Sequence, residues 1–368
     1  MPMSLRAIEF YSGIGGLHLA LSSCAVAGSV VRAYDWDQST CKVYEARYGP
    51  GIVKKADISL LTAQELAWLN ADIWLCSPSC QPYTVLNPQA KGEGDSRAKS
   101  FIHLIENVLP SLVEMKQHPR YLLVENVAGF ETSSTRQKLL RVLFSLGYSN
   151  VELLLTPLQF GVPNSRLRYY LLAKFGAPFA HLNGSEDAHV WRHIPGKGTD
   201  WADPRSDLAA NAHQYVTPLE DYLDLAMNET EFTRFSVSDK VLEKWGRLFD
   251  IVLPSSRRSC CFTRGYTKLA ERAGSILQMN EALDTTEVFD RFLEAQKSGD
   301  PEAVRILDCL RLRYFSPDEL LRIFCFQKSG DEPFKWPKDI SLKTQYKLIG
   351  NSVNVRVVRE LIEYLLEN

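Results

Sequence analysis

Short apolar runs alternate with amphipathic stretches along the first half of the chain. The apolar runs end at turn-forming residues, and the stretches between them carry apolar side chains at helical spacing, as at Phe101, Leu104, Ile105 and Val108. This pattern predicts strands at residues 6–11, 30–34, 71–75, 120–124, 150–155 and 168–173, and helices at residues 17–24, 40–47, 100–115 and 136–146. Parallel neighbours need crossovers of this kind. We therefore predict an α/β fold with a doubly wound, mixed but mostly parallel sheet.

The alternation stops after residue 180. Residues 181–215 carry Gly, Pro, Asp and aromatic residues without a period, which indicates a long loop or linker. Helical pieces follow at residues 217–228, 236–249 and 279–297. The last segment, QYKLIGNSVNVRVVRELIEYLL, begins with a Gly-Asn turn and continues as an amphipathic helix. We expect a first domain at residues 1–180, a smaller unit after it, and a C-terminal helix that returns to the first domain.

Composition indicates an intracellular globular protein. The chain has 368 residues, 45% of them hydrophobic, and no apolar run reaches the roughly 18 residues of a membrane span or the length of a secretory signal. Its 8 cysteines are too few for a disulfide scaffold, and Cys76 and Cys80 have no second Cys or His pair at zinc-ligand spacing. We therefore expect the protein in the cytoplasm, the nucleus or both, with no metal and no membrane contact.

The net charge of −2 argues against wholesale binding to a polyanion but permits a local basic face. Basic side chains gather in three places, which are Arg136/Lys138/Arg141, Arg166/Arg168 and Arg257/Arg258/Arg264/Lys268/Arg272. Each cluster alone fits a solvated surface better than a phosphate site.

The loops after the predicted strands carry the unusual sequences SGIGG, DWD, CSPSCQP and ENV. Ligands of doubly wound sheets bind at the carboxyl ends of the strands, so these loops mark the functional edge. In the first loop, Gly13, Gly15 and Gly16 let backbone N–H groups approach a ligand closely. His18 stands where a dinucleotide fingerprint needs its third glycine, and the Lys-Ser/Thr of a phosphate-binding loop is missing.

The acidic end of the second strand instead favours a nucleoside without phosphates. Asp35 is suited to ribose hydroxyls, Trp36 offers a flat surface to a purine, and Asp57-Ile58 could read an adenine edge. S-adenosylmethionine is the common cofactor of that kind. The alternative is a tight glycine turn beside an unrelated surface aspartate.

The stretch CSPSCQPYT, residues 76–84, places a cysteine in a rigid loop, because Pro78 and Pro82 restrict the backbone on both sides of Cys80. This cysteine has three interpretations: a buried thiol, half of a disulfide, or a nucleophile. A reducing compartment weakens the disulfide interpretation.

A series of motifs then changes the balance. FYSGIGG, the acidic end of strand two, the SCQP loop, ENV, R-x-R and GNSV occur in an order that resembles the cytosine C5-methyltransferases. The resemblance implies the Rossmann-like fold of S-adenosylmethionine-dependent methyltransferases. It also implies a set of cofactor-binding residues, which are Tyr11, Ser12, Gly13, Ile14, Gly15, Gly16, Asp35, Trp36, Asp57, Ile58, Ser77, Asn351 and Ser352.

The resemblance also assigns the chemistry. C5 of cytosine attacks a methyl sulfonium poorly until a thiolate adds at C6, and Cys80 is suited to be that nucleophile. Glu125 resembles the acid that holds N3 and the amino group, while Arg166 and Arg168 would supply positive charge to the base carbonyl and backbone. Asn126 is better suited to anchoring the loop. Ser79 departs from the proline usual before the nucleophile, which could lower the rate and keeps a catalytically weak, nucleic-acid-binding homologue as an alternative.

Within that family, the stretches CFTRGYTKLAERAGSILQ, PNSRLRYYLLAK and GEGDSRAKSF resemble the tRNA cytosine-5 methyltransferases called type-2 DNA-methyltransferase homologues. This implies a target-recognition domain at residues 181–337 and a C-terminal helix at residues 338–368 that completes the cofactor pocket. The expected partner is tRNA, at cytosine 38 of aspartate tRNA, with DNA as a weaker or alternative substrate. Substrate contacts are expected from Arg257, Arg258, Cys261, Phe262, Thr263, Arg264 and Lys268, although Cys261 is equally compatible with a structural thiol.

Overall fold

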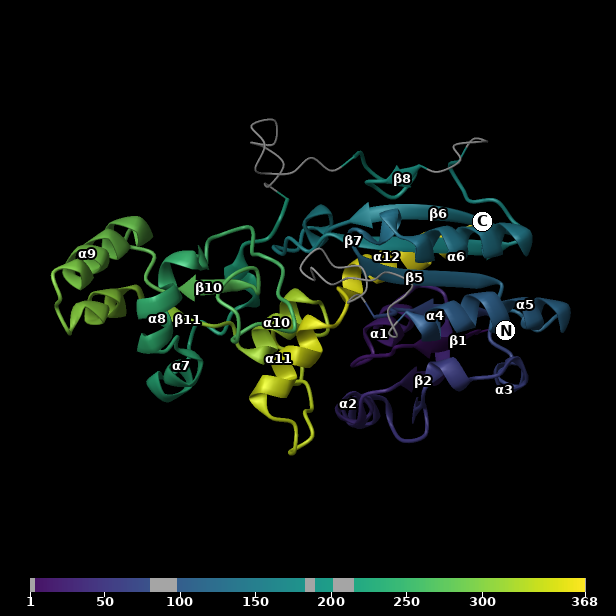
Figure 1. The fold of residues 1–368 in the computed structure, drawn as a ribbon, viewed down its shortest axis with the longest axis horizontal. Helices are drawn as coiled ribbons and strands as arrows, with labels where there is room; N and C mark the ends of the chain where they lie inside the picture. The colour runs from purple at the N-terminus through teal and green to yellow at the C-terminus, as the bar shows by residue number, and fades with distance from the viewer. Residues whose placement is uncertain (1–3, 80–97, 183–188, 201–214, 368) are drawn as a thin grey trace.

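The computed structural model describes residues 4–79, 98–182, 189–200 and 215–367. Within these residues the main feature is an eight-stranded sheet in the order β3-β2-β1-β4-β5-β7-β6-β8 (Figure 1). Its strands are β1 (Leu5–Phe10), β2 (Gly28–Asp35), β3 (Val53–Lys55), β4 (Ile73–Cys76), β5 (Tyr121–Val127), β6 (Tyr148–Leu155), β7 (Arg168–Phe175) and β8 (Val190–Trp191). Only β7 among them runs antiparallel to its neighbours. The predicted doubly wound, mostly parallel sheet is confirmed.

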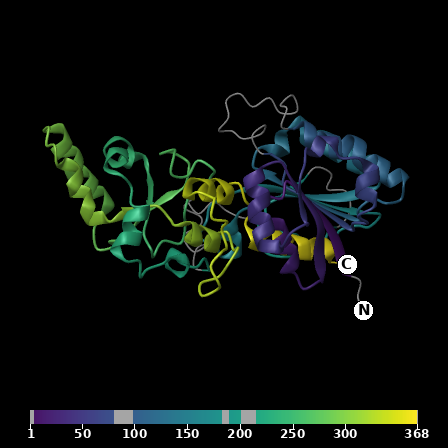
Figure 2. The ribbon, with the colours of Figure 1, turned by 90° about the horizontal axis from the view of Figure 1, so that it is seen from below.

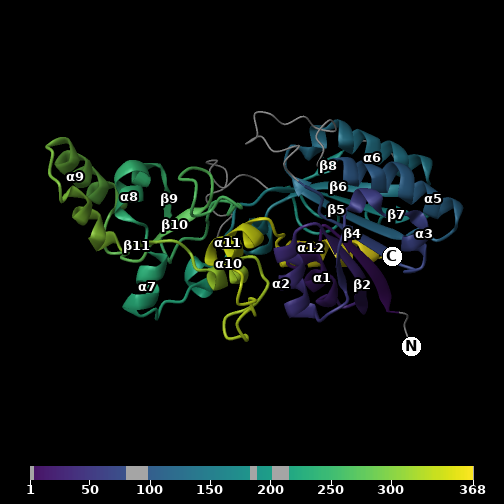
Figure 3. The same ribbon diagram turned by 60° about the horizontal axis from the view of Figure 1, so that its bottom comes forward.

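Helices cover both faces of this sheet, as Figures 2 and 3 show. One face carries α1 (Gly16–Ser22), α2 (Gln38–Tyr48) and α12 (Val355–Leu366), and the other carries α3 (Ala63–Ala67), α4 (Lys99–His103), α5 (Leu109–Glu114) and α6 (Ser134–Ser145). Alternate strand residues enter different cores: Leu75 packs on the first face and Trp74 on the second. Strands buried on both faces explain the continuous apolar runs of the sequence.

The register of the parallel strands brings the functional loops to one edge. Phe10 at the end of β1 pairs with Tyr34 of β2 and with Cys76 of β4, and Cys76 pairs with Val124 of β5. The loops after β1, β2 and β4 and the end of β5 therefore emerge side by side, as the sequence predicts.

A second, three-stranded sheet lies apart from the first (Figure 1). It contains β9 (Asp250–Val252), β10 (Ser275–Gln278) and β11 (Leu312–Arg313), and it packs with α7 (Glu229–Phe235), α8 (Asp239–Trp245) and α9 (Thr285–Lys297). Between the two sheets lie α10 (Pro317–Ile323) and α11 (Leu342–Gly350), and from there the chain returns through α12 to the large sheet. The exact domain boundaries stay a prediction. In the described parts of the chain, no helix is long and apolar enough to cross a membrane.

Several predicted elements differ from those observed. The predicted helix at 217–228 is only a 3₁₀ turn, Leu219–Tyr222, and α7 begins afterwards, where Asn228 and Glu231 form a capping box. The predicted helix at 100–115 is interrupted by a π-helical turn, Leu104–Val108, beside Pro110, which has no N–H to donate. Five short strands were not predicted: β3, β8 within the expected loop 181–215, and the three strands of the small sheet, β9, β10 and β11.

Candidate active site

The loop after β1 turns sharply and leaves open space at its tip. Gly13 and Gly15 have φ of 54° and 81°, in the left-handed region that favours glycine. A Cβ at Gly15 would lie 2.2 Å from Cε2 of Tyr48, and one at Gly16 would lie 3.2 Å from Oγ of Ser352. A Cβ at Gly13 would meet no described atom within 4 Å. The loop therefore packs tightly below and leaves room for a ligand at Gly13.

Asp35, predicted to bind a ribose, holds this loop in place. Its Oδ2 accepts the Gly13 N–H at 3.0 Å, and its Oδ1 accepts the Asp37 N–H at 2.9 Å. Burial raises the pKa of the Asp35 carboxyl, and these N–H donors oppose the rise. The neighbouring Trp36 is 68% exposed, so its ring is available to a flat ligand. Contact of either side chain with a cofactor stays a prediction.

Other predicted cofactor residues connect the loops. Ser77 Oγ donates to the carbonyl of Tyr11 at 2.9 Å, and the Tyr11 hydroxyl donates to Ser100 Oγ at 3.0 Å. The Ser12 hydroxyl is buried and has no hydrogen-bond partner in the described structure. An unpaired buried hydroxyl beside open space is what a bound polar ligand would satisfy.

The remaining predicted cofactor residues lie on two separate segments. The Asp57 carboxylate accepts both the N–H and the hydroxyl of Ser59, at 2.9 and 2.7 Å, and caps a 3₁₀ turn whose first residue, Ile58, is buried. Asn351 is exposed at the end of α11, and Ser352 is buried against the glycine loop. Ser352 is thus brought to the glycine loop, whereas the polar atoms of Asp57 already have local partners.

A buried charge cluster occupies the end of β5. Oε1 of Glu125 lies 3.5 Å from Nε of Arg168, which is on the neighbouring strand β7. The Cys261 sulfur lies 3.6 Å from Nη2 of Arg168 and 3.4 Å from Nη1 of Arg166. The sequence assigned three of these residues to catalysis and left the role of Cys261 open, and the structure brings all four together.

Opposing effects set the acidities in this cluster. Burial raises the pKa of Glu125, and Arg168 and Arg166 oppose this without cancelling it. Burial also acts to raise the pKa of the Cys261 thiol, but Arg168 and Arg166 outweigh it and bring that pKa below its ordinary value. The cluster therefore places a carboxyl of raised pKa beside a thiol of lowered pKa.

Arg166, just before β7, holds this part of the chain to the CFT segment (residues 261–263) and to the residues around the end of α11, and we call these contacts the arginine brace. This structural role revises the predicted contact of Arg166 with the target cytosine. Its guanidinium is buried and donates to the carbonyls of Phe262 at 2.8 Å, Gly350 at 3.1 Å and Ser352 at 2.6 Å. Its Cζ also lies 5.0 Å from the ring centre of Phe324. With Cys261 as the fourth partner, these contacts engage both Nη atoms. Arg168 also has partners, at the Leu167 carbonyl, Cys261 and Glu125, but unlike Arg166 it is partly exposed and lies beside Glu125.

The CFT segment is tightly packed, which corrects the substrate contact predicted for Phe262. Its side chain is fully buried, with its ring against Tyr266 and Phe315 at 5.1 and 5.0 Å between centroids. A Cβ at Gly350 would lie 2.3 Å from the carbonyl carbon of Thr263, so the GNSV motif needs its glycine here. The Phe262 side chain supports the segment and is not exposed for the predicted contact.

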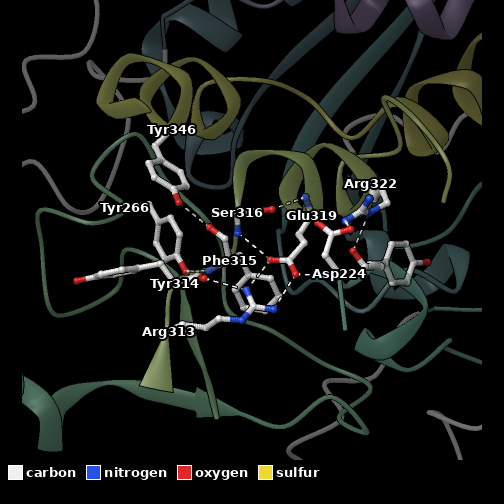
Figure 4. Close-up of polar contacts among 10 residues, drawn as sticks. Asp224, Tyr266, Arg313, Tyr314, Phe315, Ser316, Glu319, Arg322 and Tyr346 are labelled. Carbon is white, nitrogen blue, oxygen red and sulfur yellow. Dashed lines mark hydrogen bonds and ion pairs between the residues drawn. The ribbon is translucent and has the colours of Figure 1, made fainter. Parts of the chain in front are cut away.

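A polar network behind this segment joins the small sheet to α10 and α11 (Figure 4). Arg313 and Glu319 form a bidentate buried pair at 2.8 and 2.7 Å, and Glu319 also accepts the Ser316 N–H at 2.7 Å. The Tyr266 hydroxyl accepts the Phe315 N–H at 3.0 Å. The Tyr346 hydroxyl of α11 donates to the Phe315 carbonyl at 2.7 Å. These contacts fix the CFT segment relative to α11.

The predicted nucleophile, Cys80, lies outside the described residues. Just before it, the Asn126 side-chain amide donates to the Pro78 carbonyl at 3.1 Å, and its Oδ1 accepts the Val127 N–H at 2.9 Å. This is the anchoring role expected for Asn126. Ser79, which replaces the usual proline, is half-buried.

The basic residues expected to contact phosphates fall into two groups. Arg257 donates to the Val216 carbonyl, and Arg258 lies 3.5 Å from Asp250, so both have partners within the chain. Arg264 and Lys268 are exposed and lie four residues apart in the turns that follow the CFT segment. The geometry therefore favours Arg264 and Lys268 as the more available contacts.

One feature of the site was missed in the sequence. Glu9 is fully buried on β1 beneath the glycine loop, and its signal was a lone carboxylate inside the apolar run AIEFY. Among the described residues, no three His, Cys, Asp or Glu side chains lie close enough to hold a metal ion.

Comparison with known proteins agrees with this geometry. Residues 5–367 match the model of the family "C-5 cytosine-specific DNA methylase". A Schizosaccharomyces pombe relative, named tRNA (cytosine(38)-C(5))-methyltransferase, is 37% identical over 99% of this chain and 97% of its own. A Dictyostelium discoideum relative, named DNA (cytosine-5)-methyltransferase, is 33% identical over 98% of this chain and 94% of its own.

The likeness extends to three-dimensional structure. The crystal structure of S. pombe Dnmt2 methyltransferase superposes with a TM-score of 0.77 at 35% identity, covering 99% of this chain and 98% of that one. The match spans both sheets and the returning C-terminal helix. The chain belongs to the family of C-5 cytosine-specific DNA methylases, whose members are S-adenosylmethionine-dependent methyltransferases.

Proposed function

We propose that the chain methylates C5 of cytosine in tRNA, with S-adenosylmethionine as methyl donor, at cytosine 38 in the anticodon loop of aspartate tRNA. One observation carries the proposal: an open glycine loop and the buried cluster of Glu125, Arg168 and Cys261 meet at one edge of one sheet. The S. pombe relative named for cytosine 38 of tRNA shares nearly the whole chain and supports the choice of substrate.

The residues around the glycine loop fit the proposed cofactor. The space at Gly13, the unpaired hydroxyl of Ser12 and the exposed ring of Trp36 suit a nucleoside with polar groups and a flat base. Asp35 and Trp36 would hold its ribose and adenine, and Ser352 would close the pocket from the C-terminal side. When bound, the cofactor supplies a methyl group carried on a sulfonium centre.

Glu125 is suited to hold a proton for the target base. Because burial raises its pKa, it retains its proton more readily near neutrality than an exposed glutamate does. A neutral carboxyl can donate a hydrogen bond to N3 of cytosine, and this draws electrons from the ring as a nucleophile adds. Arg168, 3.5 Å away, would supply positive charge beside the base carbonyl.

The proposed covalent step rests on the resemblance of the Cys80 loop to that of the cytosine C5-methyltransferases. The Cys80 thiolate would form a bond to C6 and move electron density to C5, which would take the methyl group from the sulfonium, with S-adenosylhomocysteine as the leaving group. Loss of the C5 proton to a base and cleavage of the S–C6 bond then restore the aromatic ring and the thiolate. Asn126 holds the carbonyl of Pro78, two residues before this cysteine, and so limits the movement of the loop.

The target base must leave its stack, which favours tRNA over duplex DNA. Extruding a base from a duplex costs a few kcal/mol, whereas an anticodon loop presents bases that are already unpaired. A duplex reader must also neutralise a long run of phosphates, yet the net charge here is −2.

Two other functions have specific support. The D. discoideum relative is named for DNA, which keeps a DNA cytosine C5-methyltransferase as the second candidate. Ser79 supports a catalytically weak homologue that binds nucleic acid, because the usual proline is absent from the nucleophile loop.

A transfer assay distinguishes the three. Labelled S-adenosylmethionine is offered with total tRNA and, in parallel, with duplex DNA at equal concentration of cytosine sites. Glu125→Gln serves as the matched inactive control. We expect tRNA to be methylated faster. Faster methylation of DNA would replace the proposal with the DNA reading, and tRNA binding without transfer to either substrate would favour the weak homologue.

A further inference from the structure

A closed polar cluster lies directly beneath the glycine loop. Glu9 on β1, His18 on α1 and Tyr44 on α2 have exposures of 0%, 9% and 0%, and their polar atoms face one another. Glu9 precedes the loop in sequence and His18 follows it. The cluster therefore spans both ends of the loop proposed to bind the cofactor.

Glu9 supports the first turn of α1 from the strand below. Its Oε1 accepts the His18 N–H at 3.3 Å, and the Leu17 N–H also contributes. The N-cap position of this helix is Gly15, which has no side chain to cap it. A carboxyl group from β1 thus replaces the missing cap, and the glycine loop leads directly into the turn that it holds.

Tyr48 completes the support from α2. Its ring stacks on His18, with 3.8 Å between centroids and 12° between planes, and its hydroxyl donates to the Gly15 carbonyl at 2.7 Å. At the other end of the loop, Asp35 accepts the Gly13 N–H. The loop is therefore held at Gly13, Gly15 and His18 by side chains from three elements.

The groups that face Glu9 leave its carboxyl without an ion pair in the described structure. From α2 it meets the hydroxyl of Tyr44, with Tyr48 beyond; from α1 it meets His18; and from β2 the charge of Asp35 repels it. Arg47 lies on the outer side, with its Cζ 5.5 Å from the Tyr48 ring centre. Burial raises the pKa of Glu9 to about 8, with the hydrogen bonds opposing, and burial lowers the pKa of His18 to about 4.

Two directions are open to these hydrogen bonds, because neutral His18 can carry its proton on either ring nitrogen. When Glu9 is protonated and His18 carries its proton on Nε2, the Glu9 O–H donates to the Tyr44 oxygen across 2.8 Å, and the Tyr44 O–H donates to Nδ1 of His18 across 2.7 Å. Ionised Glu9 would instead accept from Tyr44, and Nδ1 of His18 would then have to carry a proton. Ionisation therefore excludes the first direction and leaves a buried carboxylate without a cation.

We infer that Glu9 is a positioning residue for the cofactor loop: its carboxyl, linked through Tyr44 to His18, sets the first turn of α1 beneath Gly13–Gly16. The inference rests on the proposed cofactor. It predicts that cofactor affinity falls when Glu9 loses its proton, because the turn that presents the loop loses its support.

Glu9→Gln is the decisive variant, because an amide reproduces the neutral carboxyl. Its oxygen can accept from His18 N–H and its nitrogen can donate to Tyr44. Calorimetry with S-adenosylhomocysteine should give affinities within about twofold of wild type at pH 7, whereas Glu9→Ala should lose about tenfold or more. From pH 7 to pH 9 the wild type should weaken by up to about tenfold relative to Glu9→Gln, since one pH unit above a pKa depletes the proton tenfold. The comparison cancels titration of the ligand itself.

Leu139→Ala is the matched structural control. Leu139 is buried on α6, on the opposite face of the sheet, so this variant should lower the melting temperature while keeping affinity for S-adenosylhomocysteine. If Glu9→Ala does not fold, the comparison of wild type with Glu9→Gln still decides. Equal loss of affinity in Glu9→Gln and Glu9→Ala, or parallel pH profiles for wild type and Glu9→Gln, would overturn the inference. Failure of the wild type to bind S-adenosylhomocysteine would instead refute the proposed cofactor.

Discussion

Two buried glutamates on the large sheet have opposite surroundings. Glu9 on β1 meets a tyrosine hydroxyl and backbone N–H groups, and forms no ion pair in the described structure. Glu125 on β5 lies 3.5 Å from the guanidinium of Arg168, with Arg166 behind it. Burial raises the pKa of both, but only at Glu125 do arginines oppose it. Glu9, which is buried without a cation beside it, is suited to hold the backbone in place. Glu125, which is buried beside two arginines, is suited to exchange a proton with a ligand.

The same contrast runs through the two halves of the site. The floor of the glycine loop is built of aromatic rings and neutral hydrogen bonds, with His18 stacked on Tyr48. The other half is built around two arginines and a thiol of lowered pKa, Cys261. A cofactor that must be bound tightly in one pose fits the first, and a ring that must accept negative charge during reaction fits the second.

The largest difference between the two glutamates is expected in kcat, when each is replaced by glutamine. Glu125→Gln removes the proton donor of the proposed reaction and should lower kcat by about 10²–10⁴-fold, with affinity for S-adenosylhomocysteine unchanged. Glu9→Gln keeps the neutral hydrogen bonds and should retain most of the activity at pH 7. Methyl transfer to tRNA and calorimetry measure both variants. Comparable losses of kcat in the two would end the comparison.

The next largest effect is expected at the arginine brace. Arg166→Lys removes the forked donors to the carbonyls of Phe262, Gly350 and Ser352, and leaves buried acceptors unpaired. The free energy of unfolding should fall by about 2–4 kcal/mol. Arg168→Lys is the control, because the Arg168 guanidinium is partly exposed. It should lower the free energy of unfolding less than Arg166→Lys does, and it should lower the rate of methyl transfer at least as much. Urea unfolding gives the comparison, and a larger loss of stability at Arg168 would contradict the assignment of the brace.

A smaller effect concerns stability against pH. Unfolded Glu9 titrates near 4.5 and folded Glu9 near 8, so between these values the folded state keeps a proton that the unfolded chain has released. Stability from Glu9 is therefore fully present below pH 4.5 and is lost as the pH rises through about 8. From pH 6 to pH 7 the wild type should lose up to about 1.4 kcal/mol relative to Glu9→Gln. A difference that stays constant with pH would show that Glu9 is already ionised.

The smallest expected effect is at Ser79. Ser79→Pro restores the φ restraint usual before the nucleophile and should raise the transfer rate by about two- to fivefold, in line with the 0.4–1 kcal/mol typical of such changes. Asn126 already holds the neighbouring Pro78 carbonyl, so a larger gain is not expected. Single-turnover rates of methyl transfer measure it. An unchanged or lower rate would mean that Ser79 does not limit this enzyme.

The sequence predicted the sheet and its functional edge because these depend on local patterns. Apolar runs buried on both faces, and the loops SGIGG and ENV at their ends, are visible without any tertiary contact. The brace role of Arg166 could not be predicted, because its acceptors lie at residues 262, 350 and 352. The burial of Phe262 and the cluster of Glu9, His18 and Tyr44 likewise depend on packing between distant segments.

The central claim is that the buried Glu125, whose pKa is raised, serves cytosine C5 methylation of tRNA, while Glu9 serves only the cofactor loop. Bisulfite sequencing of aspartate tRNA, after equal reaction times at pH 7 with wild type, Glu9→Gln and Glu125→Gln, tests it most directly. We expect protection of cytosine 38 with wild type and Glu9→Gln, and none with Glu125→Gln. Protection of cytosine 38 by Glu125→Gln at the wild-type level, or of no cytosine by the wild type, would contradict the account.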